Sequence, residues 1–153
     1  MRLSLREVTA KDMDLLYEWA NDPTVRQNAF HTEPIPYEDH KMWFAKNLAD
    51  REVLMYILCS ISAGEKEEPL GQIRLSIEED KALIDYSVDA SRRGQGLGAK
   101  MILMAEEKLR ESRRDVTHCI ARSNMRIRHL QRYLKNAGMT GRIWNSILSF
   151  LSV

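Results

Sequence analysis

Residues 88–100, VDASRRGQGLGAK, constrain the fold more than any other part of the chain. A strand-like run enters this segment and an apolar helix-like run, beginning at Met101, leaves it. Three glycines in five positions, Gly94, Gly96 and Gly98, allow a tight turn and a close approach of the backbone to a ligand. The first N–H groups of the following helix, at the positive end of its dipole, would point at an anion. The segment therefore predicts a strand–loop–helix unit that binds a pyrophosphate.

The spacing of the glycines distinguishes between kinds of phosphate loop. A mononucleotide P-loop requires Lys and then Ser or Thr after its last glycine, but Gly98 is followed by Ala99 and Lys100. The dinucleotide pattern is met in form by Gly94, Gly96 and Ala99, yet no acidic ribose partner stands about twenty residues further on. A third pattern, Arg/Gln-x-x-Gly-x-Gly/Ala, is matched from Arg93. A glycine-rich turn between a strand and a helix can also bind no ligand, so the order of the surrounding elements is needed to distinguish the two cases.

Length and composition favour one ordinary globular domain over residues 1–153. The content is 44% hydrophobic and 29% charged residues, and the net charge of +1 argues against a general polyanion binder. Cys59 and Cys119 lie in apolar runs, which fits reduced buried thiols better than a disulfide or a metal site. No zinc spacing, signal segment or transmembrane-length run is present, so we expect a cytoplasmic protein.

Hydrophobic periodicity and turn signals predict a series of short elements. Strands are expected at 3–8, 51–62, 70–77, 82–88 and 116–121, with one or two more within 143–153. Helices are expected at 11–20, 37–48, 101–109 and 125–136. The first helix should stop at Asn21-Asp22-Pro23, and residues 78–81 should form a tight polar turn. The predicted order is β-α-α-β-β-β-loop-α-β-α-β.

The glycine loop, its preceding strand and this order of elements resemble the GNAT acetyltransferase superfamily, and the resemblance covers most of the chain. It implies an α/β fold of the α+β type: a single layer of mixed, centrally splayed β-sheet flanked by helices. The pantetheine of acetyl-CoA would lie in the split beside strand 82–88. Trp19-Ala20-Asn21-Asp22-Pro23 and residues 35–44 are similar to enzymes that acetylate a nucleotide-linked amino sugar, as in pseudaminic acid pathways. Related Trp-x-Asn-Asp-Pro segments occur in ribosomal-protein N-terminal acetyltransferases.

The resemblance also implies how the cofactor would be held. A main-chain N–H near Val88 would stabilise the oxyanion, and the phosphates would sit on the N–H groups from Arg93 to Ala99. The Arg93 side chain would add a fork for a phosphate oxygen, although Arg92 and Arg93 also fit solvated loop charges. The expected cofactor-binding residues are Val88, Arg93, Gly94, Gln95, Gly96, Leu97, Gly98, Ala99 and Asn124.

An ammonium cannot attack a thioester, so the reaction needs a proton acceptor. The resemblance favours Asp85, in the middle of the strand beside the cofactor groove, and the alternative is an outward-facing partner of an arginine. His31 and His40 would also suit the task, or are surface histidines. For the leaving thiolate the family uses a tyrosine four residues before the glycine that ends the last helix. That position is Leu134 here, so we assign the role to the neighbouring Tyr133.

Residues between the first two long helices face the acceptor in the resemblance. The expected substrate-binding residues are Arg26, Asn28, Phe30, His31 and Tyr37. Arg26 and Asn28 also fit caps of local turns, and most of the aromatic set, Trp19 and Trp43 included, fits the core. The basic C-terminal region from Arg110 to Arg142 fits either phosphate binding or a solvated helix face.

The sequence thus predicts an acetyl-CoA-dependent N-acetyltransferase without a metal, with acetyl-CoA as its cosubstrate. Its first expected acceptor is a small-molecule primary amine on a nucleotide sugar, and the alternative is a protein N-terminus. A noncatalytic acyl-CoA sensor is the alternative from another class. We expect no membrane and no nucleic acid as partners, and the sequence leaves a homodimer open.

Overall fold

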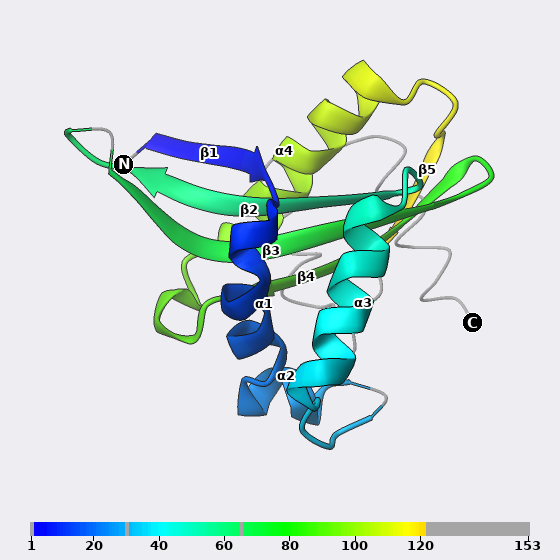
Figure 1. Ribbon diagram of the computed structural model, residues 1–153. Coiled ribbons are helices and arrows are strands. Elements are labelled where there is room, and N and C mark those ends of the chain that lie inside the picture. Colours follow the sequence, from blue (N-terminus) through cyan, green and yellow to red (C-terminus); the bar gives the residue numbers. More distant parts are fainter. Residues whose placement is uncertain (1, 30, 65, 122–153) are drawn as a thin grey trace.

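The computed structural model describes residues 2–29, 31–64 and 66–121, and these build a five-stranded sheet with helices on both faces (Figure 1). The strands are β1 (Arg2–Glu7), β2 (Val53–Ile61), β3 (Glu67–Glu78), β4 (Lys81–Val88) and β5 (His118–Ala121), and they lie side by side in chain order. Neighbours from β1 to β4 are antiparallel, and β5 is parallel to β4. The sheet is therefore mixed, and the predicted fold class is confirmed.

The meander β2–β3–β4 lies where the sequence predicts three strands, and the largest shift of a boundary is at the start of β3. β3 begins at Glu67 rather than at residue 70, because Glu67, Glu68 and Pro69 still pair with the end of β2. The register shifts between Leu58 and Cys59, so this extension continues past a bulge. The predicted polar turn joins β3 to β4 through two residues, and Glu79 takes a positive φ of 58° in it.

One side of the sheet, here called the α4 face, is covered by helix α4 (Leu97–Ser112) (Figure 1). The helix connects β4 to the parallel strand β5, as such crossovers do. Apolar side chains of the two layers interlock here; Leu58, Ile73, Met101 and Ala105 lie in this core with essentially no exposed surface. This packing fixes the start of α4 against the end of β4, where the glycine loop lies.

The opposite side, the α1–α3 face, is covered by α1 (Met13–Ala20) and α3 (Tyr37–Ala49) (Figure 1). A 3-10 turn η1 (Ala10–Asp12) precedes α1. Leu16, Trp19 and Phe44 pack on Ile57 and Cys59 of β2 in a second core. Cys59 and Cys119 are both buried free thiols, as predicted.

A short helix, α2 (Pro23–Gln27), stands where the sequence predicts only a stop. The Asp22 carboxylate accepts hydrogen bonds from the N–H groups of Thr24 and Val25, and Pro23 occupies the first helical position. The residues that end α1 therefore also begin α2. Five residues are too few for a hydrophobic period to reveal.

The α1–α3 face changes character across the sheet. Ile73 and Tyr86 point into the α4 core, so their strand neighbours point to the α1–α3 side. These neighbours, Gln72, Arg74, Asp85 and Ser87, form what we call the polar strip. No helix in the described part of the chain is long and apolar enough to cross a membrane.

Candidate active site

The glycine loop lies between the C-terminal end of β4 and the first turn of α4. The Asp89 carboxylate accepts from the Ser91 N–H and begins the short turn η2 (Ala90–Arg92). Gly94 and Gly96 then take positive φ values of 79° and 71°, a region that strains residues with a side chain. Gly96 is the N-cap of α4, so the free N–H groups of the first helical turn open onto the loop. This is the strand–loop–helix unit that the sequence predicts.

Two other glycines are required by close packing rather than by φ. A Cβ on Gly98 would lie 2.8 Å from Cε2 of Tyr86, whose ring supports the first turn of α4. A Cβ on Gly71 would lie 2.6 Å from the Ser87 carbonyl oxygen and 3.2 Å from Cα of Val88. Both contacts place the end of β4 tightly between β3 and α4, so its backbone has little freedom to shift.

The backbone of Val88 faces the edge of β4 that lies away from β3. The Asp89 N–H donates to the Leu70 carbonyl of β3 at 2.8 Å, and successive N–H groups of a strand point to opposite edges. The Val88 N–H must therefore point the other way. In the described residues, β4 pairs with β5 as far as Ile84 with Ala121. This last pair lies four residues before Val88 along β4.

Arg93 reaches back across this edge. Its Nε donates to the Val88 carbonyl at 3.2 Å, and its Nη2 donates to Asp22 Oδ1 at 2.7 Å. Burial raises the pKa of the Asp22 carboxyl, but the hydrogen bonds from Arg93 and from the Val25 N–H outweigh it, so this pKa lies below the ordinary value. Arg92 instead pairs with Glu68 on β3. Both arginines thus have carboxylate partners.

Asp85 stands in the polar strip, with 52% of its side chain exposed. Its Oδ2 accepts from Arg74 Nη2 at 3.0 Å, and the Arg74 guanidinium lies 5.1 Å from the centre of the Trp43 ring. The partner arginine that the sequence analysis gave as an alternative is therefore present. Trp43 is 38% exposed, so the prediction that it belongs to the core is wrong: its ring packs on the guanidinium instead.

Three of the expected substrate-binding residues make hydrogen bonds to other residues of helices α1 to α3 and their connections. Arg26 donates to the carbonyls of Ala20 and His31, and Asn28 donates to the Thr24 carbonyl. Tyr37 donates its hydroxyl hydrogen to Asp14 and is 40% exposed. His31 is exposed, so its ring is open to solvent.

His40 is buried between α1 and α3, with 2% of its surface exposed. Its Nε2 donates to the Met13 carbonyl at 3.0 Å, and its ring lies among Tyr17, Trp43 and Phe44. These contacts make it a link between two helices, so it is neither a surface histidine nor open to an acceptor. Phe30, Asn124, Tyr133 and Leu134 lie outside the described residues, as does the basic region beyond Ala121.

The sequence analysis assigned no site role to Trp19, Asn21, Asp22 or Asp89. The Trp19 indole N–H donates to Asp89 Oδ2 at 2.8 Å, and hydrogen bonds from Ser91 and Trp19 hold the pKa of Asp89 below its ordinary value. The signal was the Trp-x-Asn-Asp-Pro motif, whose residues meet the glycine loop at two points. Their partners stand about seventy positions away, which a single sequence does not reveal.

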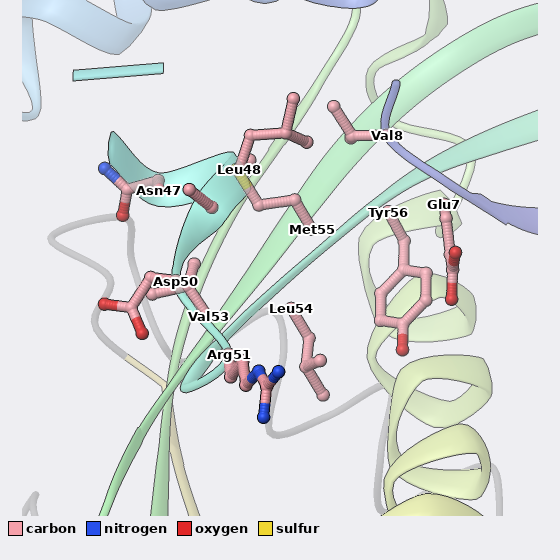
Figure 2. Close-up of a pocket in the computed structure, with 11 residues that line it drawn as sticks. Glu7, Val8, Asn47, Leu48, Asp50, Arg51, Val53, Leu54, Met55 and Tyr56 are labelled. Carbon is pink, nitrogen blue, oxygen red and sulfur yellow. The ribbon is translucent and has the colours of Figure 1, made fainter. Parts of the chain in front are cut away.

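A separate open pocket of about 240 Å³ lies where α3 ends and β2 begins (Figure 2). Asn47, Leu48 and Arg51 line one side, and Glu7 and Tyr56 lie opposite. Val53 pairs with Ser76 near the β3–β4 hairpin, so the pocket is at the other end of the sheet from Val88. It is not part of the glycine-loop site. Among the described residues, no His, Cys, Asp and Glu cluster could hold a metal ion.

Solved structures of similar fold include several acetyltransferases. A domain from Methanocaldococcus jannaschii superposes with a TM-score of 0.73 at 18% identity, over 91% of this chain and 88% of that one. Spermidine N-acetyltransferase from Vibrio cholerae, in complex with CoA and spermine, gives 0.68 at 14% identity, over 89% and 78%. Aminoglycoside acetyltransferase AAC(6')-Ib, in complex with coenzyme A, gives 0.67 at 23% identity, over 88% and 82%. At these identities the likeness shows the fold.

The family follows from a sequence comparison. The model of the acetyltransferase (GNAT) domain matches residues 2–140, which is nearly the whole chain. No curated protein matches the chain at a significant level. The family match confirms the predicted enzyme class, an N-acetyltransferase with acetyl-CoA as its cosubstrate. The chain belongs to the GNAT family of acetyltransferases.

Proposed function

We propose that this protein transfers the acetyl group of acetyl-CoA to a primary amine on a polar small molecule, with a nucleotide-linked amino sugar as the first candidate. The observation that carries the proposal is the pair of surfaces meeting at the end of β4. The glycine loop with the first turn of α4 lies on one side, and the polar strip with its carboxylate lies on the other face of the sheet.

The loop supplies a binding site for the diphosphate of acetyl-CoA. The N–H groups between Arg93 and Ala99 would hold phosphate oxygens, helped by the positive end of the α4 dipole. The pantetheine would run along the edge of β4 that faces away from β3, where the Val88 N–H points. There the same N–H can donate to the thioester carbonyl oxygen as negative charge develops on it.

The chemistry requires one proton acceptor and one leaving group. The nitrogen lone pair of the amine attacks the thioester carbonyl carbon, and the tetrahedral oxyanion collapses with departure of the CoA thiolate. The proton released from nitrogen passes to Asp85, directly or through a water molecule, and the thiolate takes a proton from Tyr133 or from solvent. Asp85 suits this role because its carboxylate is exposed on the polar strip.

The acceptor surface is polar and carries both charges. Gln72 donates to the Ser87 hydroxyl at 3.2 Å, next to the Arg74–Asp85 pair. Hydroxyl, amide and charged groups of this kind suit a hydroxylated amine such as an amino sugar. The structural neighbours are named for spermidine and for aminoglycosides, which also carry primary amines. The Trp-x-Asn-Asp-Pro motif keeps a protein N-terminus as the second candidate acceptor.

The test is release of free CoA from acetyl-CoA, followed with a thiol reagent. The panel contains UDP-linked 4-amino sugars, N-terminal peptides, a polyamine and an aminoglycoside. Turnover with the amino sugars supports the first candidate, and turnover with peptides alone replaces it with the second. Calorimetric binding of acetyl-CoA without turnover on any acceptor would favour the sensor.

Asp85→Asn tests the assigned proton acceptor. We expect kcat to fall by about 10²–10⁴-fold while the affinity for CoA is unchanged. Asp115→Asn is the matched control, because Asp115 is also an exposed carboxylate paired with an arginine, Arg113, at 2.9 Å. Asp115 follows α4, away from the polar strip, so this variant should retain wild-type kcat. An Asp85 variant with wild-type kcat would remove Asp85 from the mechanism.

A further inference from the structure

The segment Trp19–Asp22 joins the acceptor-side helices to the glycine loop by two separate contacts. The Trp19 indole N–H donates to Asp89 Oδ2 at 2.8 Å, at the beginning of the loop. The Asp22 carboxylate accepts from Arg93 at 2.7 Å, four residues further along the loop. Figure 1 shows the end of α1 and the start of α2 beside the connection from β4 to α4. The loop is therefore held from the acceptor side at both ends of the stretch 89–93.

Two hydrogen bonds fix the orientation of the Arg93 guanidinium. A guanidinium is planar and presents five N–H groups in a fixed fork. The Val88 carbonyl receives Nε and Asp22 receives one Nη2 hydrogen, which together fix the plane of the fork. The remaining N–H groups of the same plane can serve an anion bound at the loop. The side chains of Arg93 and Asp22 are 29% and 19% exposed, so the pair is partly shielded from water.

A third contact, made by Asn21, joins the segment to the residues before α3. The Asn21 side-chain amide donates to the Ile35 carbonyl at 3.2 Å, and its oxygen accepts from the Ile35 N–H at 2.7 Å. Ile35 stands just before α3, whose Trp43 contacts Arg74 in the polar strip. A continuous set of contacts thus runs from the glycine loop through Asp22 and Asn21 to the helix that borders the acceptor surface.

We propose that Asp22 is a positioning residue for acetyl-CoA: it orients Arg93 toward the phosphates and couples the acceptor-side helices to the cofactor loop. This inference rests on the proposed function. Asp22 itself touches neither substrate. Its effect is transmitted through Arg93, with the Trp19–Asp89 hydrogen bond as a parallel connection.

Asp22 also caps α2, and one substitution separates the two roles. Asparagine is as good an N-cap as aspartate, so Asp22→Asn keeps the hydrogen bonds from Thr24 and Val25. It removes the negative charge that attracts Arg93, and the amide oxygen that remains is a weaker acceptor for the guanidinium. We expect the Kd of CoA, measured by calorimetry, and the KM for acetyl-CoA to rise about tenfold, which is within the usual range of coupling between sites. We expect kcat to change by less than about twofold, since Asp22 does not touch the reacting atoms.

The pairing with Arg93 is tested by a double-mutant cycle. Arg93→Gln removes the guanidinium but keeps an amide that can donate to the Val88 carbonyl, and it should also weaken CoA binding. If Asp22 acts through Arg93, adding Asp22→Asn to Arg93→Gln produces no further loss. Fully additive effects on the Kd of CoA would overturn the proposal.

A matched control separates positioning from stability. Asp12 is another aspartate beside a helical turn, and Arg6 donates to both of its carboxylate oxygens at 2.8 and 2.9 Å. Asp12→Asn should lower the melting temperature and leave the Kd of CoA unchanged. Trp19→Phe removes the hydrogen bond to Asp89 together with part of a buried ring, so it should raise the Kd of CoA by a smaller factor, about threefold, and lower the melting temperature as Asp12→Asn does. This second variant decides the matter if Asp22→Asn does not fold.

The outcomes distinguish this inference from the proposed function. If the wild-type protein binds CoA and both Asp22→Asn and Trp19→Phe bind it equally well, the positioning role is wrong and the proposed function stands. If the wild-type protein does not bind CoA at all, both are wrong. A rise in the Kd of CoA that Asp12→Asn also shows would assign the effect to lost stability and overturn the positioning role.

Discussion

The two faces of the sheet are built from the same strands and differ in what they carry. On the α4 face, apolar side chains from β2, β3, β4 and α4 are buried almost completely. On the α1–α3 face the packing is apolar over β2 and becomes polar over β3 and β4. Ile73 has no exposed surface, yet its neighbours Gln72 and Arg74 belong to the polar strip. Alternate residues of the same strand therefore face the buried core that stabilises the sheet and the polar surface that could bind a substrate.

The largest expected difference between the faces is in the free energy of unfolding. Ile73→Ala leaves a cavity in the α4 core and should lower this free energy by about 2–5 kcal/mol. Gln72→Ala, one residue away on the other face, should cost less than about 1.5 kcal/mol, the scale of one net hydrogen bond. Urea denaturation of both variants gives the comparison. Equal losses would show that the two faces are not distinct in stability.

Gly98 tests whether the α4 core packs tightly up to the glycine loop. Gly98→Ala forces the Tyr86 ring to move and should cost about 1–3 kcal/mol, as overpacking does. Gly94→Ala is the comparison: a Cβ there meets no atom within 4 Å, and only the positive φ opposes it, at about 1–2 kcal/mol. Replacing Tyr86 by Leu should recover part of the Gly98→Ala loss and none of the Gly94→Ala loss in thermal unfolding. Recovery in both would exclude the ring as the cause.

Sensitivity to acid should come from the α1–α3 side. Hydrogen bonds from Arg6 outweigh burial and hold the pKa of Asp12 below its ordinary value of 3.8. Because the folded pKa is depressed, this contribution is complete above the ordinary value and is lost as the pH falls through the folded value. Stability curves should therefore decline below pH 4, by about 1–3 kcal/mol for this group. Asp12→Asn should flatten that decline, and an unchanged slope would contradict the assignment.

The smallest expected effect concerns the polar strip itself. Arg74→Gln removes an exposed ion pair to Asp85 and the contact with the Trp43 ring, and should cost about 0.5–1 kcal/mol of stability. Chemical denaturation at two salt concentrations checks it, because the ion-pair part is screened by salt. A loss above 2 kcal/mol would show that the strip supports the fold and is less free to serve an acceptor.

The elements of the fold could be predicted because their signals are local. Runs rich in β-forming residues between polar turns revealed the strands of the meander, the apolar stripe revealed α4, and the glycines revealed the turn between β4 and α4. Together with their order, these signals carry the resemblance to the GNAT superfamily, and the family match confirms it. The prediction missed α2, where Asp22-Pro23 gives the same signal for a stop and for a start.

The site was harder to predict, because its contacts join distant positions. Trp19 and Asp89 are seventy residues apart, and Asp22 and Arg93 are seventy-one apart. The Trp-x-Asn-Asp-Pro segment contributes to a family resemblance without showing what its side chains touch. Trp43 was misjudged for the same reason: its helical position suggested a core, but Arg74 from β3 covers part of its ring.

The two hydrogen bonds between Asn21 and Ile35 hold together the ends of the stretch that contains α2 and its connection toward α3. Closing a chain segment at its ends costs free energy that rises only slowly with its length. Insertions or replacements between residues 28 and 34 would therefore leave the contacts of Trp19 and Asp22 with the glycine loop in place. The expected acceptor-binding residues of this segment can thus be exchanged without disturbing the cofactor end of the molecule.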